Sequence, residues 1–477
     1  MREEKKAAYE YFFNKLFGGI KMSNLTSTKE LKRTLGFWDL MGASVGQIIG
    51  AGIMSLTGVA IGMTGRSAPL AFILSAAMVL ISWYPLTLIN TTARFRGGQY
   101  SIIGSLLGEK YTGAYTIIFI LTNISLSMYC LSFADYALPF LPFVPRKLLA
   151  IGILIILYGL NFLEIDKFAK FQNVIVVSLV VALTTFTIYG FGKIDANYMD
   201  PASFMTGGWL GLLRATAQLT FATGGAQVIA NLSGEAKNPT RDIPRVMVTS
   251  TLAVAVPYGF MATVAAGVFP VAHVANEPLT HVAKEILPKQ LYVFFIVGGA
   301  WAALISTLNS QLASATKPLM QAANDGWLPA KLATLHRNYK TPMYLLTIFF
   351  FVGLLPIVFN LNISIISKIV TTVQSVTNSM IALCLLSVAK KLPKQWENSP
   401  LHIKEGAVKA LVTAAVMIFI VQAILLGTSL SIPLLIGNAC VVIFAFTYAN
   451  VRYNSGKIKC DISYEIEDVK EEEKKEE

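Results

Sequence analysis

The sequence predicts an all-α integral membrane protein, and three observations support that class. Of its 477 residues, 54% are hydrophobic and only 14% are charged, whereas a soluble domain carries about a quarter charged residues. The apolar residues gather in runs of roughly twenty, the length of helix that crosses the hydrocarbon core of a bilayer. These runs do not show the strict apolar–polar alternation of barrel strands, so we expect helices.

Each run is expected to form one membrane-spanning helix, about twelve in all. In chain order the predicted spans are 38–62, 68–92, 113–140, 147–163, 171–192, 208–233, 246–269, 290–316, 343–360, 364–389, 408–427 and 432–450. An even number of spans places both ends of the chain on the same side of the membrane.

The positive charges indicate which side that is. A net charge of +12 would suit a nucleic-acid-binding protein, but the positions of the charges favour a membrane protein. Lysines and arginines cluster before the first span and in every second loop after it, while the alternate loops hold few. By the positive-inside rule, both termini are cytoplasmic. We therefore expect a multi-pass protein of the plasma membrane, embedded in the lipid bilayer and binding no nucleic acid.

The loops are too short to hold another domain, so we expect a single transmembrane domain over residues 37–452. A cytoplasmic segment, 1–36, precedes it, and a charged cytoplasmic tail, 453–477, follows it. Residues 6–20 mix aromatics with lysines, which suits either a helix lying on the inner leaflet or a disordered tail. The four cysteines are scattered without a CxxC pair, and they indicate neither a metal site nor a disulfide framework.

Two of the predicted spans are interrupted by glycine near the middle of the apolar run. One interruption, at 48–53, has the sequence IIGAGI, and the other, at 221–226, has the sequence FATGGA. Glycine weakens a helix by roughly 1 kcal/mol relative to alanine. Unwound backbone at membrane depth survives only where it faces protein or a cavity. A pair of such breaks in corresponding positions predicts the binding site of a transporter.

The glycines also have a simpler interpretation as packing residues. Gly42, Gly46 and Gly50 are spaced by four residues, which lets helices approach closely in lipid. Gly52 and the glycine pair at 224–225 fit that spacing less well, so we expect unwinding at these positions.

The spans divide into two blocks of similar size, each opening with a broken span. The first five spans cover about 38–192, and the next five cover about 208–389. Because each block holds an odd number of spans, the second enters the membrane from the opposite side, and the blocks are expected to be inverted repeats. The last two spans, about 408–450, lie outside this scheme.

Three ordered motifs carry a family resemblance. The stretch 48–58 is IIGAGIMSLTG, the stretch 230–245 is ANLSGEAKNPTRDIPR, and the stretch 322–329 is AANDGWLP. They resemble the first-helix signature, the exit of the sixth helix and the loop after the eighth helix of the amino acid–polyamine–organocation (APC) transporter superfamily. Within it, FATGGAQ at 221–227 most resembles the sixth helix of L-type and related neutral amino acid exchangers. The resemblance implies a leucine-transporter-type fold of five-plus-five inverted repeats with helices 1 and 6 broken, working by alternating access.

The resemblance places an amino acid zwitterion at the two breaks. N–H groups that begin a half-helix can hold its carboxylate with help from the helix dipole. The resemblance assigns this role to Gly50, Ala51 and Gly52. Carbonyls that end a half-helix can accept from its ammonium, and those implied are Ile48, Phe221 and Gly224. This arrangement needs no charged side chain, which suits spans that contain few charges.

Two further residues are expected to act as gates. Phe221 falls where the family has an aromatic outer gate, whose ring closes over the substrate. Glu235 ends the sixth span on the cytoplasmic side, where the resemblance implies an ion pair that seals the inner gate. A solvated charge at a helix end is the alternative for Glu235.

The pocket departs from that of L-type relatives. Ala222, Thr223 and Ala226, at the second break, are also expected to contact the substrate. Thr223 and Ala226 replace bulky aromatics, which leaves room for a larger substrate or requires another side chain to refill it. Tyr129 of the third span is expected to line the pocket as such a filler. Asn123 and Ser127 are further candidates, and interhelical hydrogen bonds are the alternative role for these polar residues.

A second difference from the family pattern bears on the coupling ion. Many family members carry a lysine seven residues after a glutamine like Gln172, but this chain has Leu179 there. A sodium ion could replace that ammonium, held by first-helix carbonyls and by hydroxyls of the eighth span. The candidate hydroxyls are those of Ser306, Thr307 and Ser310, which could instead bond their own backbone. Coupling to Na⁺ or H⁺ stays open, and no other cofactor or metal is expected.

These observations predict a secondary active transporter, a symporter or exchanger, of amino acids. Neutral L-amino acids are favoured because no charged partner lines the predicted pocket. The alternatives are a sensor that binds an amino acid without transporting it, and a permease for a cationic amino acid or a polyamine. The spans contain no paired acids, HExxH motif or nucleophile–base set, so we do not expect an enzyme. The sequence leaves the oligomeric state open.

Overall fold

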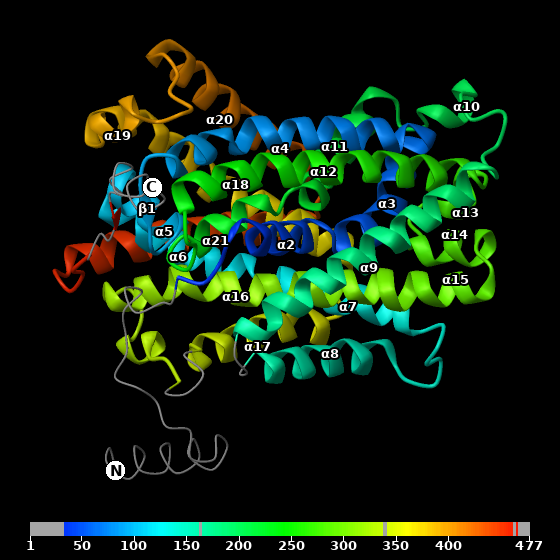
Figure 1. Ribbon diagram of the computed structural model, residues 1–477, viewed down its shortest axis with the longest axis horizontal. Coiled ribbons are helices and arrows are strands. Elements are labelled where there is room, and N and C mark those ends of the chain that lie inside the picture. The colour runs from blue at the N-terminus through cyan, green and yellow to red at the C-terminus, as the bar shows by residue number, and fades with distance from the viewer. Residues whose placement is uncertain (1–32, 162–164, 337–340, 461–463, 466–477) are drawn as a thin grey trace, which may run out of the picture.

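The computed structural model of this protein describes residues 33–161, 165–336, 341–460 and 464–465. Its helices lie side by side along the long axis of the molecule (Figure 1). Within the described residues, the strands are β1 (Arg94–Phe95) and β2 (Tyr464–Glu465), which pair antiparallel. The predictions for residues 6–20, and for most of the segments 1–36 and 453–477, lie outside the described residues.

Helices occur at every range where the sequence predicts a span. The longer ones are α2 (Phe37–Ile48), α3 (Ala51–Thr64), α4 (Ala68–Asn90), α6 (Glu109–Thr122), α7 (Ser125–Ala137), α8 (Arg146–Leu160), α9 (Ile165–Phe191), α11 (Gly208–Thr223), α12 (Pro239–Gly267), α16 (Ala302–Asn324), α17 (Met343–Val358), α18 (Ile363–Lys391), α20 (Glu405–Gly427) and α21 (Ile432–Asn454). The shorter ones are α5 (Gln99–Ile102), α10 (Pro201–Phe204), α13 (Val271–Val274), α14 (Leu279–Ile286), α15 (Lys289–Phe294) and α19 (Pro393–Glu397).

Eight of the described helical stretches are long and apolar enough to cross a membrane. One of them, Phe37–Asn90, contains 54 residues, which is more than twice the length needed for one crossing. The outer surfaces of the bundle are apolar as well. Val177, Ile424 and Ile443, on three different helices, expose half or more of their side chains. Exposed apolar surface of this kind is suited to lipid.

Some helix boundaries differ from the predicted ranges because residues that favour the first turn of a helix lie outside the apolar run. The prediction begins one span at 246, but α12 begins at Pro239 and carries Asp242 in its first turn. Proline is pre-organised for the first helical position, and an acidic residue there is stabilised by the helix dipole. The charged end of this helix therefore projects beyond the apolar stretch.

The predicted span 290–316 contains a π-helical turn, η5 (Phe295–Trp301), between α15 and α16. Two glycines let this turn approach α9. The hydroxyl of Ser178 on α9 donates to the Gly298 carbonyl at 3.0 Å, and a Cβ at Gly299 would lie 2.9 Å from Ala182. The π-turn is therefore a close-packing device between these two helices.

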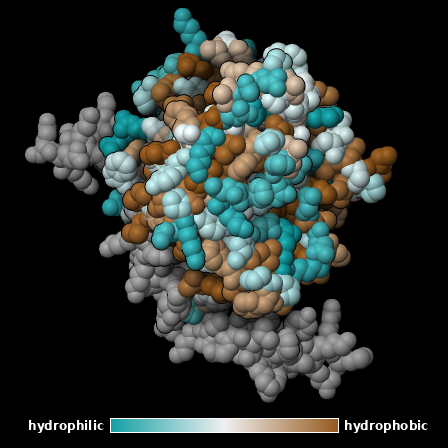
Figure 2. Space-filling view, turned by 90° about the vertical axis from the view of Figure 1, so that its right-hand side faces the viewer, coloured by the Kyte–Doolittle hydropathy of each residue, from teal (hydrophilic) through white to brown (hydrophobic). Residues whose placement is uncertain are grey.

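The two ends of the bundle are capped by short elements. The end with α5, α19 and β1 lies at the left of Figure 1, and the end with α10, α13, α14 and α15 lies at the right. Seen from the right-hand end, hydrophilic side chains gather over the middle of the face and hydrophobic ones lie toward its edges (Figure 2). The interrupted segments lie within the bundle, where α11 packs on α3 and α4 while α12 and α16 pack on α2.

Candidate functional site

The first break separates α2 from α3. Ile49 and Gly50 leave helical geometry between the two helices. No side chain caps the start of α3 in the described part of the chain. The first hydrogen bond of α3, from the Met54 N–H to the carbonyl of its N-cap residue Gly50, is long at 3.5 Å. The first N–H groups of α3, beginning with Ala51 and Gly52, therefore have no acceptor within the helix and are suited to an anion.

A carbonyl and two glycines of this break are in contact with neighbouring helices. Tyr258 on α12 donates its hydroxyl to the Ile48 carbonyl at 3.0 Å. A Cβ at Gly50 would clash with the Thr307 side chain, and one at Gly52 would clash with the backbone of Ala222 on α11. Both glycines therefore allow close helix packing as well as interrupting the helix.

Thr307 on α16 lies among three carbonyl oxygens. Its Oγ1 is 2.6 Å from Gly46 O, 3.2 Å from Ile49 O and 3.0 Å from Ala303 O. A hydroxyl has one hydrogen and can satisfy only one of these acceptors fully. The surplus of oxygen atoms is the environment that a hard cation prefers. The other two hydroxyl residues predicted for a sodium site are buried on the same helix: Ser306 and Ser310. Leu179 on α9 is buried as well.

The second break follows α11. Gly224 and Gly225 lead into the 3-10 turn η4 (Ala226–Leu232). Gly225 has φ 135°, a conformation that is essentially restricted to glycine. Its N–H donates to Gln227 Oε1 at 2.8 Å. A Cβ at Gly225 would lie 3.1 Å from the Gln47 carbonyl carbon and the Ile48 nitrogen, so the two breaks are in direct contact.

A cavity of about 100 Å³ lies beside the second break. Hydroxyl and amide side chains form much of its wall, and no Asp, Glu, Lys, Arg or His of the described chain lines it. The amides in this wall include Gln47, Gln99, Asn123, Gln227, Asn231 and Gln311. The cavity is therefore polar but carries no charged side chain.

Several of these amides form a relay across the cavity wall. Gln47 Nε2 on α2 donates to Gln311 Oε1 on α16 at 2.8 Å. Gln311 Nε2 donates to Asn123 Oδ1 at 2.8 Å, and Asn123 Nδ2 donates to the Phe119 carbonyl at 2.7 Å. Asn123 is the residue at which α6 ends before α7. The relay therefore connects α2, α16 and the α6–α7 junction.

The predicted substrate residues divide into two groups. Tyr129, Phe221 and Gly224 line the cavity, and the Tyr129 and Phe221 rings stack with centroids 6.3 Å apart. The remaining ones are not among the lining residues and are buried nearby: Ile48, Gly50, Gly52, Ala222, Thr223 and Ala226.

Two of the candidate residues, Thr223 and Ser127, hydrogen bond to residues that do not line the cavity. Thr223 Oγ1 hydrogen bonds to Ser75 Oγ on α4 at 2.5 Å. Ser127, a candidate filler, donates to the Ile124 carbonyl at 2.6 Å. The side chains of Ala51 and Gln172 lie outside the described residues, so the structure places neither of them.

The loop that follows η4 is held in place by a buried ion pair and by hydrogen bonds to its backbone. Glu235 Oε1 lies 2.6 Å from Lys317 Nζ on α16, and both residues are buried. The Arg94 guanidinium donates to the carbonyls of Ala236 and Lys237 at 2.8 and 2.9 Å. Leu35, just before α2, exchanges backbone hydrogen bonds with the same loop. The approach to the first broken segment is therefore joined to the exit of the second.

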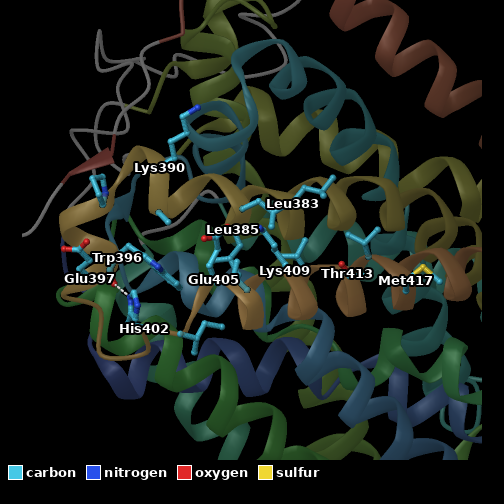
Figure 3. A pocket seen from close by; sticks show the side chains of 17 residues that line it. Leu383, Leu385, Lys390, Trp396, Glu397, His402, Glu405, Lys409, Thr413 and Met417 are labelled. Carbon is cyan, nitrogen blue, oxygen red and sulfur yellow. Dashed lines mark hydrogen bonds and ion pairs between the residues drawn. The ribbon is translucent and has the colours of Figure 1, made fainter.

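A second, larger hollow of about 1030 Å³ lies between α18, α19 and α20. Figure 3 shows side chains such as Leu383 and Met417 along it, with Glu397 and His402 at one end. Its lining contains no residue of either break. We therefore assign the candidate substrate site to the cavity between the broken segments.

Sequence reasoning missed most of the polar wall, although a signal was present. Gln47, Gln227 and Gln311 lie within or beside predicted spans, where a polar side chain is costly unless it has a partner or a function. Tyr258 was missed because a tyrosine in a span usually belongs to packing or to the membrane interface.

Comparison with known proteins identifies the family of this chain. The family model described as amino acid permease matches residues 35–450. The chain belongs to the amino acid permease family. This membership confirms the APC superfamily predicted from the three motifs. It also identifies a membrane transporter of amino acids, not an enzyme.

Individual relatives are distant, and the substrates in their names differ. The uncharacterized protein MJ0609 of Methanocaldococcus jannaschii is 28% identical, over 63% of this chain and 71% of its own length. The branched-chain amino acid permease BcaP of Bacillus subtilis is 26% identical, over 68% and 73%. The methylthioribose transporter of the same organism is 24% identical, over 67% and 74%.

Proposed function

We propose that this permease is a secondary active transporter of neutral L-amino acids that works by alternating access. The observation that carries the proposal is a polar cavity without a charged side chain between two broken membrane segments. A zwitterion brings one positive and one negative group, both of which main-chain dipoles can satisfy. A cationic amino acid or polyamine would need an acidic partner, and the described lining has none.

The carboxylate is proposed to bind the N–H groups of Gly50, Ala51 and Gly52 at the uncapped start of α3. The ammonium is proposed to bind the carbonyls of Ile48, Phe221 and Gly224. Two of these residues, Phe221 and Gly224, line the cavity. The open helix start supports the carboxylate assignment because N–H groups without acceptors form an anion site.

The proposed coupling ion is sodium. Thr307 Oγ1 and the carbonyls of Gly46, Ile49 and Ala303 already lie together, and oxygen ligands are what a hard cation selects. An ion there would join α16 to the first break, and through it to the proposed substrate groups. Sodium binding could in this way favour one conformation of the first broken segment.

Two pairs of side chains are the proposed gates. The stacked rings of Phe221 and Tyr129 form the outer one, and the buried pair of Glu235 and Lys317 forms the inner one. Opening the inner gate separates this pair, which requires water to reach both charges.

The proposed membrane topology includes twelve spans, with 38–192 and 208–389 as inverted repeats and both termini cytoplasmic at the plasma membrane. It also keeps the expected division into segments 1–36, 37–452 and 453–477, and a likeness to L-type exchangers.

Flux through proteoliposomes tests this proposal. The purified protein should show saturable uptake of a labelled neutral L-amino acid that unlabelled L-amino acids inhibit, and trans-stimulation would identify exchange. Replacing sodium with choline should lower uptake. Binding without flux would instead identify a sensor, and inhibition only by cationic amino acids or polyamines would contradict the neutral assignment.

A further inference from the structure

The direction of each hydrogen bond in the amide relay is fixed from one end. Asn123 Nδ2 donates to the Phe119 carbonyl, and a carbonyl can only accept. Asn123 therefore presents Oδ1 to Gln311, which must donate its Nε2. Gln311 in turn presents Oε1, to which Gln47 must donate. The group of Gln47 left over at the end of the relay is an acceptor, Oε1.

This leftover acceptor is buried without a partner. Within the described residues Gln47 Oε1 makes no hydrogen bond, and the same holds for Thr371 Oγ1 on α18. Both residues line the cavity and are less than one-tenth exposed. A buried polar atom left unsatisfied costs about 1–3 kcal/mol. Two such atoms in one cavity are suited to a ligand that supplies the missing hydrogen bonds.

We propose that the transported amino acid carries an uncharged side chain with a hydrogen-bond donor, a hydroxyl or carboxamide, which donates to Gln47 Oε1. Thr371 Oγ1 supplies a second contact to the same side chain. This inference rests on the proposed function and specifies its substrate class. An aliphatic side chain of the same shape would fill the cavity and leave both polar atoms unpaired, so the site selects against it.

The ammonium of any amino acid is also a donor, and it is the competing partner for Gln47 Oε1. The two assignments make different predictions. If Gln47 receives the ammonium, its loss weakens every amino acid alike. If it receives the side chain, its loss weakens only those amino acids whose side chains donate. Main-chain carbonyls at both breaks are the proposed ammonium acceptors, which leaves Gln47 for the side chain.

Competition by isosteric pairs tests the inference. Uptake of labelled L-threonine into proteoliposomes is measured against unlabelled L-threonine or L-valine, and against L-asparagine or L-leucine. The wild-type protein should prefer the donor-bearing member of each pair by at least about tenfold. Gln47→Leu, and independently Thr371→Val, should lower that ratio several-fold while valine and leucine retain their inhibition. Thr371→Val keeps the shape of the side chain, so it tests the site even if Gln47→Leu fails to fold.

Gln218→Leu is the matched control. Gln218 is a buried amide on α11 that donates to Ser364 Oγ and is not among the residues that line the cavity. Its replacement should leave the ratio unchanged. Equal inhibition within each pair, or an equal loss for all amino acids in Gln47→Leu, overturns the inference while amino acid transport stands. If no amino acid inhibits or is taken up, the proposed function itself fails.

Discussion

The two breaks have similar glycine-rich sequences but different surroundings. At the first break, other helices engage the main-chain acceptors: Tyr258 binds Ile48 O, and Thr307 lies against Gly46 O and Ile49 O. At the second break, Phe221, Gly224 and Gly225 line the cavity. The comparison indicates that glycine has two different roles in this protein. At the first break it brings α2 and α3 against α16 and α11, and at the second it shapes the cavity wall.

The largest expected effect on transport is at Gly225, because the backbone of the second break depends on the positive φ of this one residue. Gly225→Ala introduces a Cβ at φ 135°, where strain costs about 1–3 kcal/mol. The new atom would also lie 3.1 Å from the Gln47 backbone. Transport should fall by about tenfold or more, the factor that corresponds to 1.4 kcal/mol. Uptake rates at equal protein density in proteoliposomes measure this.

Gly159→Ala provides the control for this variant. Gly159 lies on α8, and a Cβ added to it meets nothing within 4 Å, so uptake should stay near the wild-type rate. If Gly225→Ala also transports normally, the second break does not depend on its glycine conformation, and the contrast between the breaks is lost.

An intermediate effect is expected at Thr307, which tests whether the first break holds an ion. Thr307→Val keeps the shape of the side chain but removes the oxygen that lies among three carbonyls. The sodium concentration for half-maximal uptake should rise by about tenfold, because a hard cation loses one oxygen ligand. Thr307→Ser retains the oxygen and should restore most of the affinity. Uptake that is independent of sodium in the wild-type protein would contradict the ion assignment.

The helical class and the location of both breaks could be predicted from the sequence because both depend on local properties. Apolar length determines which segments form spans, and glycine determines where a helix is weak. The sequence did not predict which neighbouring helix each residue of the two breaks would contact. Gly52 packs on the backbone of Ala222, and Thr223 bonds to Ser75 on a helix distant in sequence. Such orientations depend on tertiary packing, which local patterns do not encode.

The same limit explains why the amide relay was not predicted. Asn123 was a candidate as an isolated filler, but its partner Gln311 is 188 residues away in the chain. A spacing of that kind has no periodic signature. The cost of placing an amide in a membrane segment would have selected Gln47 and Gln311 as candidates, and it is a better guide here than the glycine spacing.

The smallest effect is expected at Tyr258, and it tests whether the Ile48 carbonyl serves the substrate. Tyr258→Phe leaves that buried carbonyl without its 3.0 Å hydrogen bond, which should destabilise the substrate-free protein by about 1 kcal/mol. If the ammonium binds Ile48 O, the substrate replaces the lost bond, and the rise in melting temperature caused by substrate should be larger in the variant than in the wild-type protein. If that rise is the same in both, Ile48 O has only a structural role. The ammonium would then bind at the second break alone. The two breaks would differ in function more than their shared glycine pattern indicates.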